Sequence, residues 1–357
     1  MNVFGLPTPA LIVDEETLEQ NMERMDELLR GKRLRLRPHY KSNKCAAIAH
    51  RQMARGAVGI TCAKLSEAED LIFSGIDDVL IANQIVERGK ILRLAYLAGL
   101  CRLTVCVDDI GNAEALSQAA CAAGTTIHCL AEYEIGMDRC GVTDPVSYLA
   151  LARRITELPH LTYDGIQAYA GHISHMTSRQ EREALTAANA EKLRSLVRLL
   201  AENGITVSTI SGGSTGTADI KASEGLYTEL QAGSYLFLDS TYRKLDVPFR
   251  NSLYVLATVV SRRPGLAVLD AGVKSLGVDQ DPPVILTASG REIRGAFEAN
   301  EEHLKIFDPS EELPVGEKVF IIPGHCCSTV NLYDQLYLFR GDVVTDRLAV
   351  TARGRSQ

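Results

Sequence analysis

The sequence predicts an α/β protein, a TIM-type (β/α)8 barrel followed by a C-terminal all-β domain. Between Arg33 and Tyr235, short β-prone runs ending in Gly, Pro, Asn or Asp alternate eight times with longer segments of helical apolar periodicity. After Ser240, β-prone segments follow one another, separated by Gly, Pro and Asp, with no convincing helix. Because strand–helix alternation produces parallel strands with right-handed crossovers, eight repeats favour a closed barrel. A doubly wound sheet of about eight strands is the alternative.

Helical segments separate the predicted strands, and one further helix precedes the first of them. Asp14 is a suitable N-cap for this helix, and apolar residues at three- and four-residue steps then share one helical face. These apolar residues are Leu18, Met22, Met25 and Leu29. The eight predicted strands are Arg33–Pro38, Val58–Ala63, Asp78–Asn83, Leu103–Asp108, Thr126–Tyr133, Tyr163–Tyr169, Thr206–Gly212 and Glu229–Tyr235.

After the eighth predicted strand, the pattern changes from alternating strands and helices to strands alone, which predicts two domains. We assign residues 14–239 to the barrel and residues 240–357 to the β domain. The short run Ala10–Val13 could pair with the β domain, so residues 1–13 could complete it. The β-prone segments of this domain are Ser252–Ser261, Gly265–Asp270, Pro283–Leu286, Lys318–Ile322 and Gln335–Arg340.

Composition excludes several classes of protein. A chain of 357 residues exceeds what one compact core usually organises, and its 46% hydrophobic and 23% charged residues are typical of a globular protein. A net charge of −7 gives no reason to expect a nucleic-acid or anionic-membrane partner. We expect no membrane span and no signal peptide, because no segment has the required apolar pattern. Nine scattered cysteines indicate a reducing compartment, so we expect the cytoplasm.

Reactive side chains follow the predicted strands, where a barrel places its active site. Lys41 comes after the first strand, and low dielectric there would favour the neutral amine that forms a Schiff base. The alternative is an ordinary surface lysine. Arg139 comes after the fifth strand and could hold a phenolate or a carboxylate. The alternative for Arg139 is an ion pair with Asp138 or Glu134.

The last three predicted strands also end in candidate ligand-binding residues. Tyr169, His172 and His175 follow the sixth strand. The turns Ser211–Gly216 and Ala232–Tyr235 follow the seventh and eighth strands, and their glycines and hydroxyls suit a phosphate. Barrels bind phosphate at these two strand ends. These motifs together imply a ligand that carries a phosphate and also reacts with an amine nucleophile. Pyridoxal 5′-phosphate (PLP) has both properties.

A candidate metal site lies near the C-terminus, at His325 and Cys327. On an extended segment, residues i and i+2 point to the same side, so both could bind one ion. An imidazole and a thiolate favour zinc over a hard ion such as magnesium. The alternative is a buried cysteine pair, Cys326 and Cys327, beside a structural histidine.

Taken together, these motifs resemble a known family. The chain resembles the bacterial D-threonine aldolases, which group with eukaryotic-type D-serine dehydratases among the fold-type III, alanine-racemase-like PLP enzymes. The motifs that carry the resemblance are Arg37-Pro38-His39-x-Lys41, Met137-Asp138-Arg139-Cys140-Gly141, Gln167-Ala168-Tyr169, Gly212-Gly213-x-Thr215-Gly216, Thr228-Glu229-Leu230-Gln231-Ala232-Gly233-Ser234-Tyr235, Asp270-Ala271-Gly272-x-Lys274-Ser275 and Pro323-Gly324-His325.

The resemblance implies a PLP-binding barrel plus a β domain, assembled as a head-to-tail homodimer with shared active sites. It implies that Lys41 is the Schiff-base lysine, that Arg139 contacts the phenolic oxygen of PLP and that Tyr169 lines its ring. His175 is the implied candidate base. The implied phosphate-binding residues are Gly213, Thr215, Gly233, Ser234 and Tyr235. The implied metal ligands, beside the β-hydroxyl of the substrate, are His325 and Cys327.

The chain departs from the family pattern at two positions. The aldolases typically have Asp at the position of Cys327 and use manganese or magnesium, whereas the dehydratases typically have Cys there and use zinc. Asn43 replaces a histidine that is common two residues after the lysine.

Two reactions follow from these features. A D-threonine aldolase-like enzyme would cleave the Cα–Cβ bond of a D-β-hydroxy-α-amino acid, with a base taking the hydroxyl proton, and release glycine and an aldehyde. A zinc dehydratase of D-serine or 3-hydroxy-D-aspartate would instead use Lys41 to remove the Cα proton, and the metal would assist loss of hydroxide. The run Val330–Asp334 follows the aldolase branch, which is our leading hypothesis. A racemase, which needs no metal, and a PLP-binding protein without turnover are further alternatives.

Overall fold

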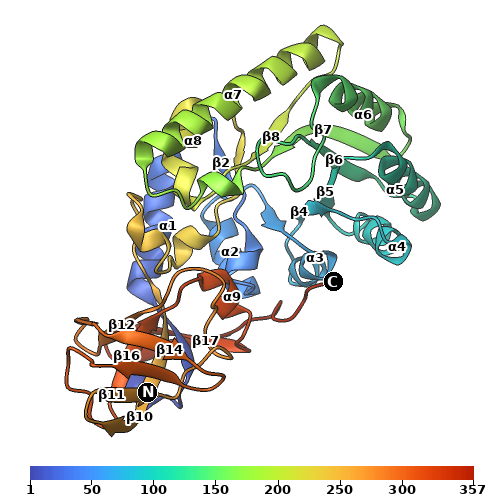
Figure 1. Ribbon diagram of the computed structural model, residues 1–357. Helices are drawn as coiled ribbons and strands as arrows, with labels where there is room; N and C mark the ends of the chain where they lie inside the picture. The colour runs from blue at the N-terminus through green and yellow to red at the C-terminus, as the bar shows by residue number, and fades with distance from the viewer. The chain divides into compact units, whose positions relative to one another are not determined.

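The computed structural model describes all 357 residues, which form two compact units (Figure 1). One unit contains residues 1–25, 42–47 and 234–354. The other contains residues 26–41, 48–233 and 355–357. The first unit carries a mainly antiparallel β-sheet and the second carries the parallel sheet, so the α/β class with an additional β domain is confirmed.

The parallel sheet contains all eight of the strands that the sequence predicts. Its strands follow the order β2-β9-β8-β7-β6-β5-β4-β3, and every pair is parallel. The strands are β2 (Arg35–Leu36), β3 (Ile60–Cys62), β4 (Asp78–Gln84), β5 (Arg102–Val107), β6 (Ile127–Glu132), β7 (Leu161–Ala168), β8 (Thr209–Gly212) and β9 (Glu229–Leu230). The first and last are shorter than predicted, because Pro38 cannot donate a ladder hydrogen bond and Gly233 gives way to a 3-10 turn.

The two edge strands of this sheet are joined to each other. The N–H groups of Val58 and Thr61 donate to the carbonyls of Leu36 and Pro38, both at 2.9 Å, and His39 forms a parallel bridge with Thr61. The sheet therefore closes into a barrel, and this closure lies just before Lys41. The doubly wound alternative is excluded, since an open sheet would leave these two edges unpaired.

Helices alternate with the strands, and polar side chains begin several of them. Asp14 Oδ1 accepts from the N–H groups of Glu16 and Thr17 at 3.1 and 3.2 Å, as expected for the predicted cap. Asp109, Asp144 and Ser178 cap later helices in the same way. The helices are α1 (Glu15–Leu29), α2 (Ala46–Ala54), α3 (Leu65–Phe73), α4 (Arg88–Leu97), α5 (Ile110–Ala123), α6 (Pro145–Glu157), α7 (Arg179–Glu202) and α8 (Ala218–Glu224).

Charged side chains fill the end of the barrel opposite to the strand carboxyl ends. Arg37 donates to Asp78 at 2.7 Å and to Glu229 at 2.8 Å, and these carboxylates belong to the first residues of β4 and β9. Burial lowers the pKa of Arg37, but the two carboxylates outweigh it and leave the pKa raised. Arg37 is thus a structural member of its motif, which links three strands rather than facing a ligand.

The β unit is built on a ten-stranded sheet that includes the N-terminal strand. β1 pairs antiparallel with β10 and parallel with β17, so the N-terminus does pair with this domain. The main order is β13-β12-β16-β10-β1-β17-β18, and β11, β15 and β14 extend it from β10. The strands are β1 (Ala10–Asp14), β10 (Leu253–Arg263), β11 (Leu266–Leu269), β12 (Val284–Thr287), β13 (Glu292–Ile293), β14 (Ala296–Ala299), β15 (Leu304–Phe307), β16 (Lys318–Ile322), β17 (Gln335–Arg340) and β18 (Val343–Ala349).

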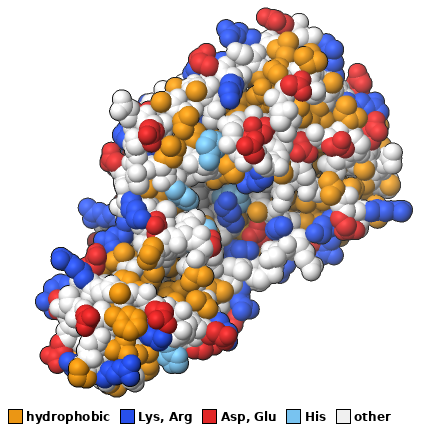
Figure 2. Space-filling view, viewed as in Figure 1, with side chains coloured by type: hydrophobic (Ala, Val, Ile, Leu, Met, Phe, Trp, Pro, Cys, Tyr) orange, Lys and Arg blue, Asp and Glu red, His pale blue; other side chains and the backbone are white.

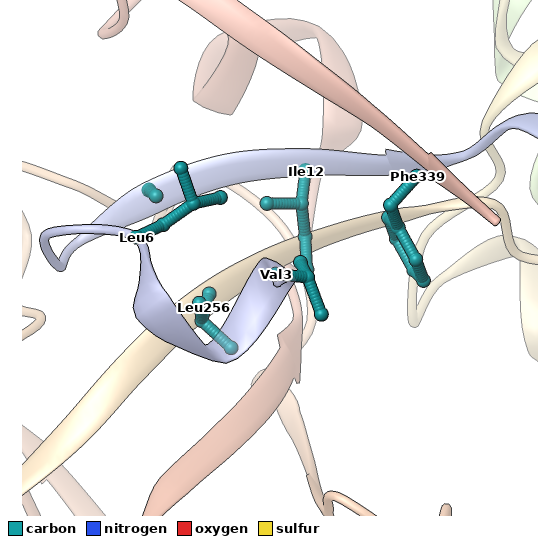
Figure 3. Close-up of a cluster of buried hydrophobic side chains, with 6 residues drawn as sticks. Val3, Leu6, Ile12, Leu256 and Phe339 are labelled. Carbon is teal, nitrogen blue, oxygen red and sulfur yellow. The ribbon is translucent and has the colours of Figure 1, made fainter. Parts of the chain in front are cut away.

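A hydrophobic cluster joins the N-terminal segment to this sheet (Figure 3). Val3, Leu6 and Ile12 pack with Leu256 of β10 and Phe339 of β17, and all five side chains are buried. Since the cluster draws on both ends of the chain, β1 is held in the middle of the sheet by side-chain packing as well as by its two ladders.

Two features of the β unit differ from the sequence prediction. The strands β13, β14, β15 and β18 were not predicted. The first three are short, and β18 is mostly exposed and contains Asp346 and Arg347. A helix of five residues, α9 (Cys326–Val330), lies where no helix was expected.

None of the helices is long and apolar enough to cross a membrane. Over the face that Figure 2 shows, Lys and Arg side chains alternate with Asp and Glu side chains, and neither sign of charge gathers into an extended patch.

Candidate active site

A cavity of about 170 Å³ lies at the carboxyl ends of the barrel strands. Its lining side chains come from the loops after β2, β3, β6, β7 and β9 and from the last residues of β4, β6 and β7. They are His39, Lys41, Ala63, Ala82, Asn83, Gln84, Glu132, Arg139, Cys140, Gln167, Tyr169 and Gln231. The barrel therefore brings three of the predicted cofactor residues together, namely Lys41, Arg139 and Tyr169.

Two cationic side chains lie near the ring of Tyr169. Lys41 Nζ is 5.8 Å from the ring centroid, and the guanidinium carbon of Arg139 is 5.5 Å from it. Lys41 belongs to a 3-10 turn whose Tyr40 hydroxyl donates to Asp70 at 2.6 Å. This bond fixes the turn, so that the lysine side chain reaches into the cavity.

The loop that carries Arg139 is folded around a carboxylate. Glu134 Oε1 accepts from the N–H groups of Gly136, Met137 and Asp138. Partial burial raises the pKa of Glu134, but these three donors outweigh it and lower the pKa below its ordinary value. Glu134 is therefore occupied with the backbone. The guanidinium of Arg139 lies over the Tyr169 ring instead of pairing with Glu134 or Asp138, the alternative that the sequence left open.

Buried amides and carboxylates form one wall of the cavity. Gln231 Nε2 donates to Gln167 Oε1 at 2.7 Å and to Ser211 Oγ at 2.9 Å. Gln84 Nε2 donates to Glu132 Oε2 at 2.6 Å, and burial raises the pKa of Glu132. Sequence reasoning did not single out these side chains as site residues, although each lies at a strand end, which is the signal that identified Lys41.

The loop after β7 carries the two predicted histidines, but neither lines the cavity. The side chain of His172 is exposed, and its backbone N–H donates to Met137 Sδ at 3.3 Å. His175 is half-buried. Arg182, a fully buried residue of α7, donates from Nη1 to the carbonyls of Met176 and Thr177 at 2.5 and 3.2 Å. This arginine holds the end of the histidine-bearing loop.

The turn after β8, where a phosphate site is predicted, is tightly packed and contains a glycine with positive φ. Gly213 has a φ of +79°, and a Cβ there would lie 2.7 Å from Lys221 Cδ and 2.9 Å from Leu230 Cδ1. Only glycine fits this position. Thr215 Oγ1 is buried and has no hydrogen-bond partner. A buried hydroxyl without a partner is rare in proteins, so this atom is available to a ligand.

The residues after β9 continue into the β unit. Ser234 and Tyr235 are buried and begin a 3-10 turn, Ser234–Leu236. Ser234 Oγ lies 3.7 Å from the sulfur of Cys327. A predicted phosphate ligand and a predicted metal ligand are thus neighbours within this unit.

The predicted metal pair does not lie on an extended segment, so that premise was wrong. His325 is the extended N-cap of α9, and Cys327 lies in the first turn of this helix. The helix forms because buried groups hold its start: the Cys326 N–H donates to Asp239 Oδ2 at 3.0 Å. Cys326 is fully buried, whereas Cys327 is half-buried and its thiol lies 3.2 Å from Ser42 Oγ.

Asp279 fixes the orientation of His325. His325 Nδ1 lies 2.6 Å from Asp279 Oδ2, and the Ser328 hydroxyl donates to Asp279 Oδ1 at 2.6 Å. Burial lowers the pKa of His325, but Cys327 and Asp279 outweigh it and raise the pKa to about 9. The imidazole of His325 therefore contacts Asp279, through Nδ1, and also the Cys327 thiol.

Comparison with known proteins identifies the family. A model of the alanine racemase N-terminal domain matches residues 13–241, and a model of a serine dehydratase domain matches residues 252–339. The chain is 40% identical to a D-threonine aldolase from Arthrobacter, over 98% of this chain and 93% of that protein. It belongs to the D-threonine aldolase and D-serine dehydratase family of PLP-dependent lyases.

Solved structures of this family have the same fold. The crystal structure of D-threonine aldolase from Filomicrobium marinum matches with a TM-score of 0.95 and 39% identity, over 100% of this chain and 98% of that one. A D-threo-3-hydroxyaspartate dehydratase, solved as a cysteine-to-alanine variant in the metal-free form, matches with a TM-score of 0.89 and 26% identity, over 98% of each chain.

The barrel of this family member fits PLP by its own geometry. The cavity offers one amine, Lys41, beside a tyrosine ring and a guanidinium, as an aromatic ring ligand with an anionic oxygen requires. The unpartnered Thr215 hydroxyl and the Gly213 turn supply a place for a phosphate.

A metal site at His325 and Cys327 would have these two residues as its protein ligands. No group of three or more His, Cys, Asp or Glu side chains is arranged to hold a metal ion. His325 and Cys327 nevertheless have the features of a ligand pair, because a carboxylate orients the imidazole and the thiol is within reach of other polar groups. The remaining coordination positions of an ion there would be open to substrate and water.

Asn43, the second departure from the family pattern, is fully buried. Its Oδ1 accepts from the Cys45 N–H at 3.0 Å, while its Nδ2 has no partner. The side chain therefore stabilises the turn after Lys41 and retains one donor for a ligand or a water molecule.

Proposed function

We propose that this protein is a PLP- and divalent-metal-dependent lyase that acts on D-β-hydroxy-α-amino acids. The proposed reaction is the D-threonine aldolase-like retro-aldol cleavage to glycine and an aldehyde. The observation that carries the proposal is the barrel cavity, in which Lys41, Arg139 and Tyr169 meet. The full-length similarity to a D-threonine aldolase supports the same reaction.

Each residue of the barrel has a proposed role toward the cofactor. Lys41 attaches PLP covalently, Arg139 contacts its phenolic oxygen and Tyr169 packs on its ring. Bound PLP withdraws electrons from Cα of the attached amino acid, so that a bond to Cα can break. The proposed phosphate-binding residues are Gly213, Thr215, Gly233, Ser234 and Tyr235.

The metal pair and one histidine are proposed to act on the β-hydroxyl group. His325 Nε2 and Cys327 hold a divalent cation, which zinc fits best because one ligand is a thiolate. Asp279 keeps the imidazole in the orientation that presents Nε2. His175 accepts the hydroxyl proton, and Arg182 positions the loop that carries it.

The second candidate function is a zinc-dependent dehydratase of D-serine or 3-hydroxy-D-aspartate. Cys327 favours it, since the aldolase branch typically has Asp at this position. A related D-threo-3-hydroxyaspartate dehydratase has been solved as a cysteine-to-alanine variant in the metal-free form. In this reaction Lys41 removes the Cα proton.

One assay separates the two candidates. The purified protein is given PLP and either Zn²⁺ or Mn²⁺, then D-threonine or D-serine, and the products are identified. Glycine with acetaldehyde from D-threonine supports the aldolase. Oxobutanoate or pyruvate with ammonia refutes the aldolase and establishes the dehydratase.

We also propose a homodimer with shared active sites, as the family resemblance implies, and a cytoplasmic location. All nine cysteines are free thiols, which is compatible with a reducing compartment. Light scattering of the purified protein would test the dimer.

A further inference from the structure

A buried lysine lies behind the phosphate turn and has no role in the proposed reaction. Lys221 belongs to α8, the helix that follows this turn, and only 4% of its surface is exposed. Lysine is almost never this buried unless an anion compensates its charge. The surroundings of Lys221 therefore need an explanation.

The side chain of Lys221 underlies the two glycines of the turn. A Cβ on Gly213 would lie 2.7 Å from Lys221 Cδ and 3.3 Å from Lys221 Cε. A Cβ on Gly212 would lie 3.0 Å from Cε1 of Tyr227. The lysine stem and the tyrosine ring thus pack directly against the backbone of the turn.

The ammonium group is incompletely compensated by its neighbours. Lys221 Nζ lies 3.6 Å from the centroid of the Tyr227 ring and 3.8 Å from Glu224 Oε2. Neither oxygen of Glu224 has a hydrogen-bond partner, so the two charges face each other without a short bond. Burial lowers the pKa of Lys221 to about 8 in spite of Glu224, and burial also raises the pKa of Glu224. An anion placed on the turn would stabilise the charged lysine.

We propose that Lys221 is a positioning residue for the cofactor phosphate, which it attracts through the Gly212–Gly213 backbone without touching it. This inference rests on the proposed function only in placing the phosphate at this turn. Tyr227 completes the arrangement, because its hydroxyl donates to the carbonyl of Ala168 at 3.1 Å and so ties Lys221 to the segment that carries Tyr169. Lys221 is thereby linked, through the Tyr227 ring and the Ala168 carbonyl, to the segment of the half-buried Tyr169.

The test compares ligands with and without a phosphate. The full-length apoprotein and its K221M, K221R and E224Q variants are titrated with PLP, with pyridoxal and with inorganic phosphate. K221M is expected to weaken the binding of PLP and of inorganic phosphate about tenfold, which is the order of one charge interaction across a thin protein layer. The affinity for pyridoxal should be unchanged. K221R should restore most of the affinity, and E224Q should strengthen phosphate binding, since it removes the opposing charge.

Other results of these titrations would overturn the proposed role of Lys221. The role of Lys221 is overturned if K221M weakens the binding of PLP and of pyridoxal equally. It is also overturned if K221M weakens the binding of neither. If K221M does not fold, E224Q decides, because an unchanged or reduced phosphate affinity in E224Q overturns the proposal. Failure of the cofactor assignment is separate: the wild-type protein would then show no covalent PLP absorbance that depends on Lys41.

Discussion

At the scale of single residues, Lys41 has the most direct test. Replacing Lys41 by Ala should abolish the near-visible absorbance of covalently attached PLP and reduce lyase activity to background, because no other amine lines the cavity. The matched control is Lys32→Ala, which removes an exposed lysine. Absorbance that persists unchanged in the Lys41 variant would show that another lysine binds the cofactor.

Cys327, the proposed thiolate ligand of the metal, can be tested by substitution. Its replacement by Asp should weaken zinc retention by roughly tenfold or more and shift the preference toward manganese, because a carboxylate is a harder ligand than a thiolate. Metal content after dialysis against equal zinc and manganese measures this change. Cys121→Asp, at an exposed thiol, is the control. Equal zinc content in wild type and the Cys327 variant would remove Cys327 from the ligand set.

Residue-level chemistry could be predicted only where the position along the fold revealed it. The position of Lys41, Arg139 and Tyr169 in one cavity could be predicted because each follows a β-strand. The Asp279–His325 contact joins positions 46 residues apart in the chain, so no local pattern predicts it. The same holds for Lys221, whose sequence context is that of an ordinary helix residue.

At the scale of elements, the loop after β7 depends on one buried side chain. Replacing Arg182 by Met should raise amide hydrogen exchange in residues 170–178 about tenfold or more, because two loop carbonyls lose their donor. Arg198→Met, at an exposed position of the same helix, should leave the exchange unchanged. If the loop exchanges at the wild-type rate without Arg182, other contacts hold it.

The elements themselves were largely predictable, since the eight barrel strands follow from repeated alternation. The helix α9 was not, because its sequence, Cys-Cys-Ser-Thr-Val, has weak helix propensity. It forms through tertiary bonds, such as the one from the Gly277 N–H to Thr329 Oγ1 at 2.9 Å. Such bonds depend on residues far away in the chain, so propensity alone could not reveal the helix.

At the scale of the whole molecule, the charges inside the barrel bear on stability. Replacing Arg37 by Met leaves Glu229 and Asp78 partly unpaired in a buried site, and we expect a loss of about 3–5 kcal/mol in the free energy of unfolding. Chemical denaturation measures it. Arg262→Met removes an exposed pair with Glu312 and should cost about 1 kcal/mol or less. Equal small effects would show that the Arg37 cluster contributes little to the fold.

The hydrogen bonds between Leu36–His39 and Val58–Thr61 also have a consequence for assembly of the protein. The segment that seals the ring is the one that presents Lys41. We therefore expect Lys41, the proposed attachment point of PLP, to become ordered only once these two edge strands have paired. During refolding, PLP absorbance should appear only after the barrel has closed. Added PLP should also stabilise the closed barrel relative to the open one.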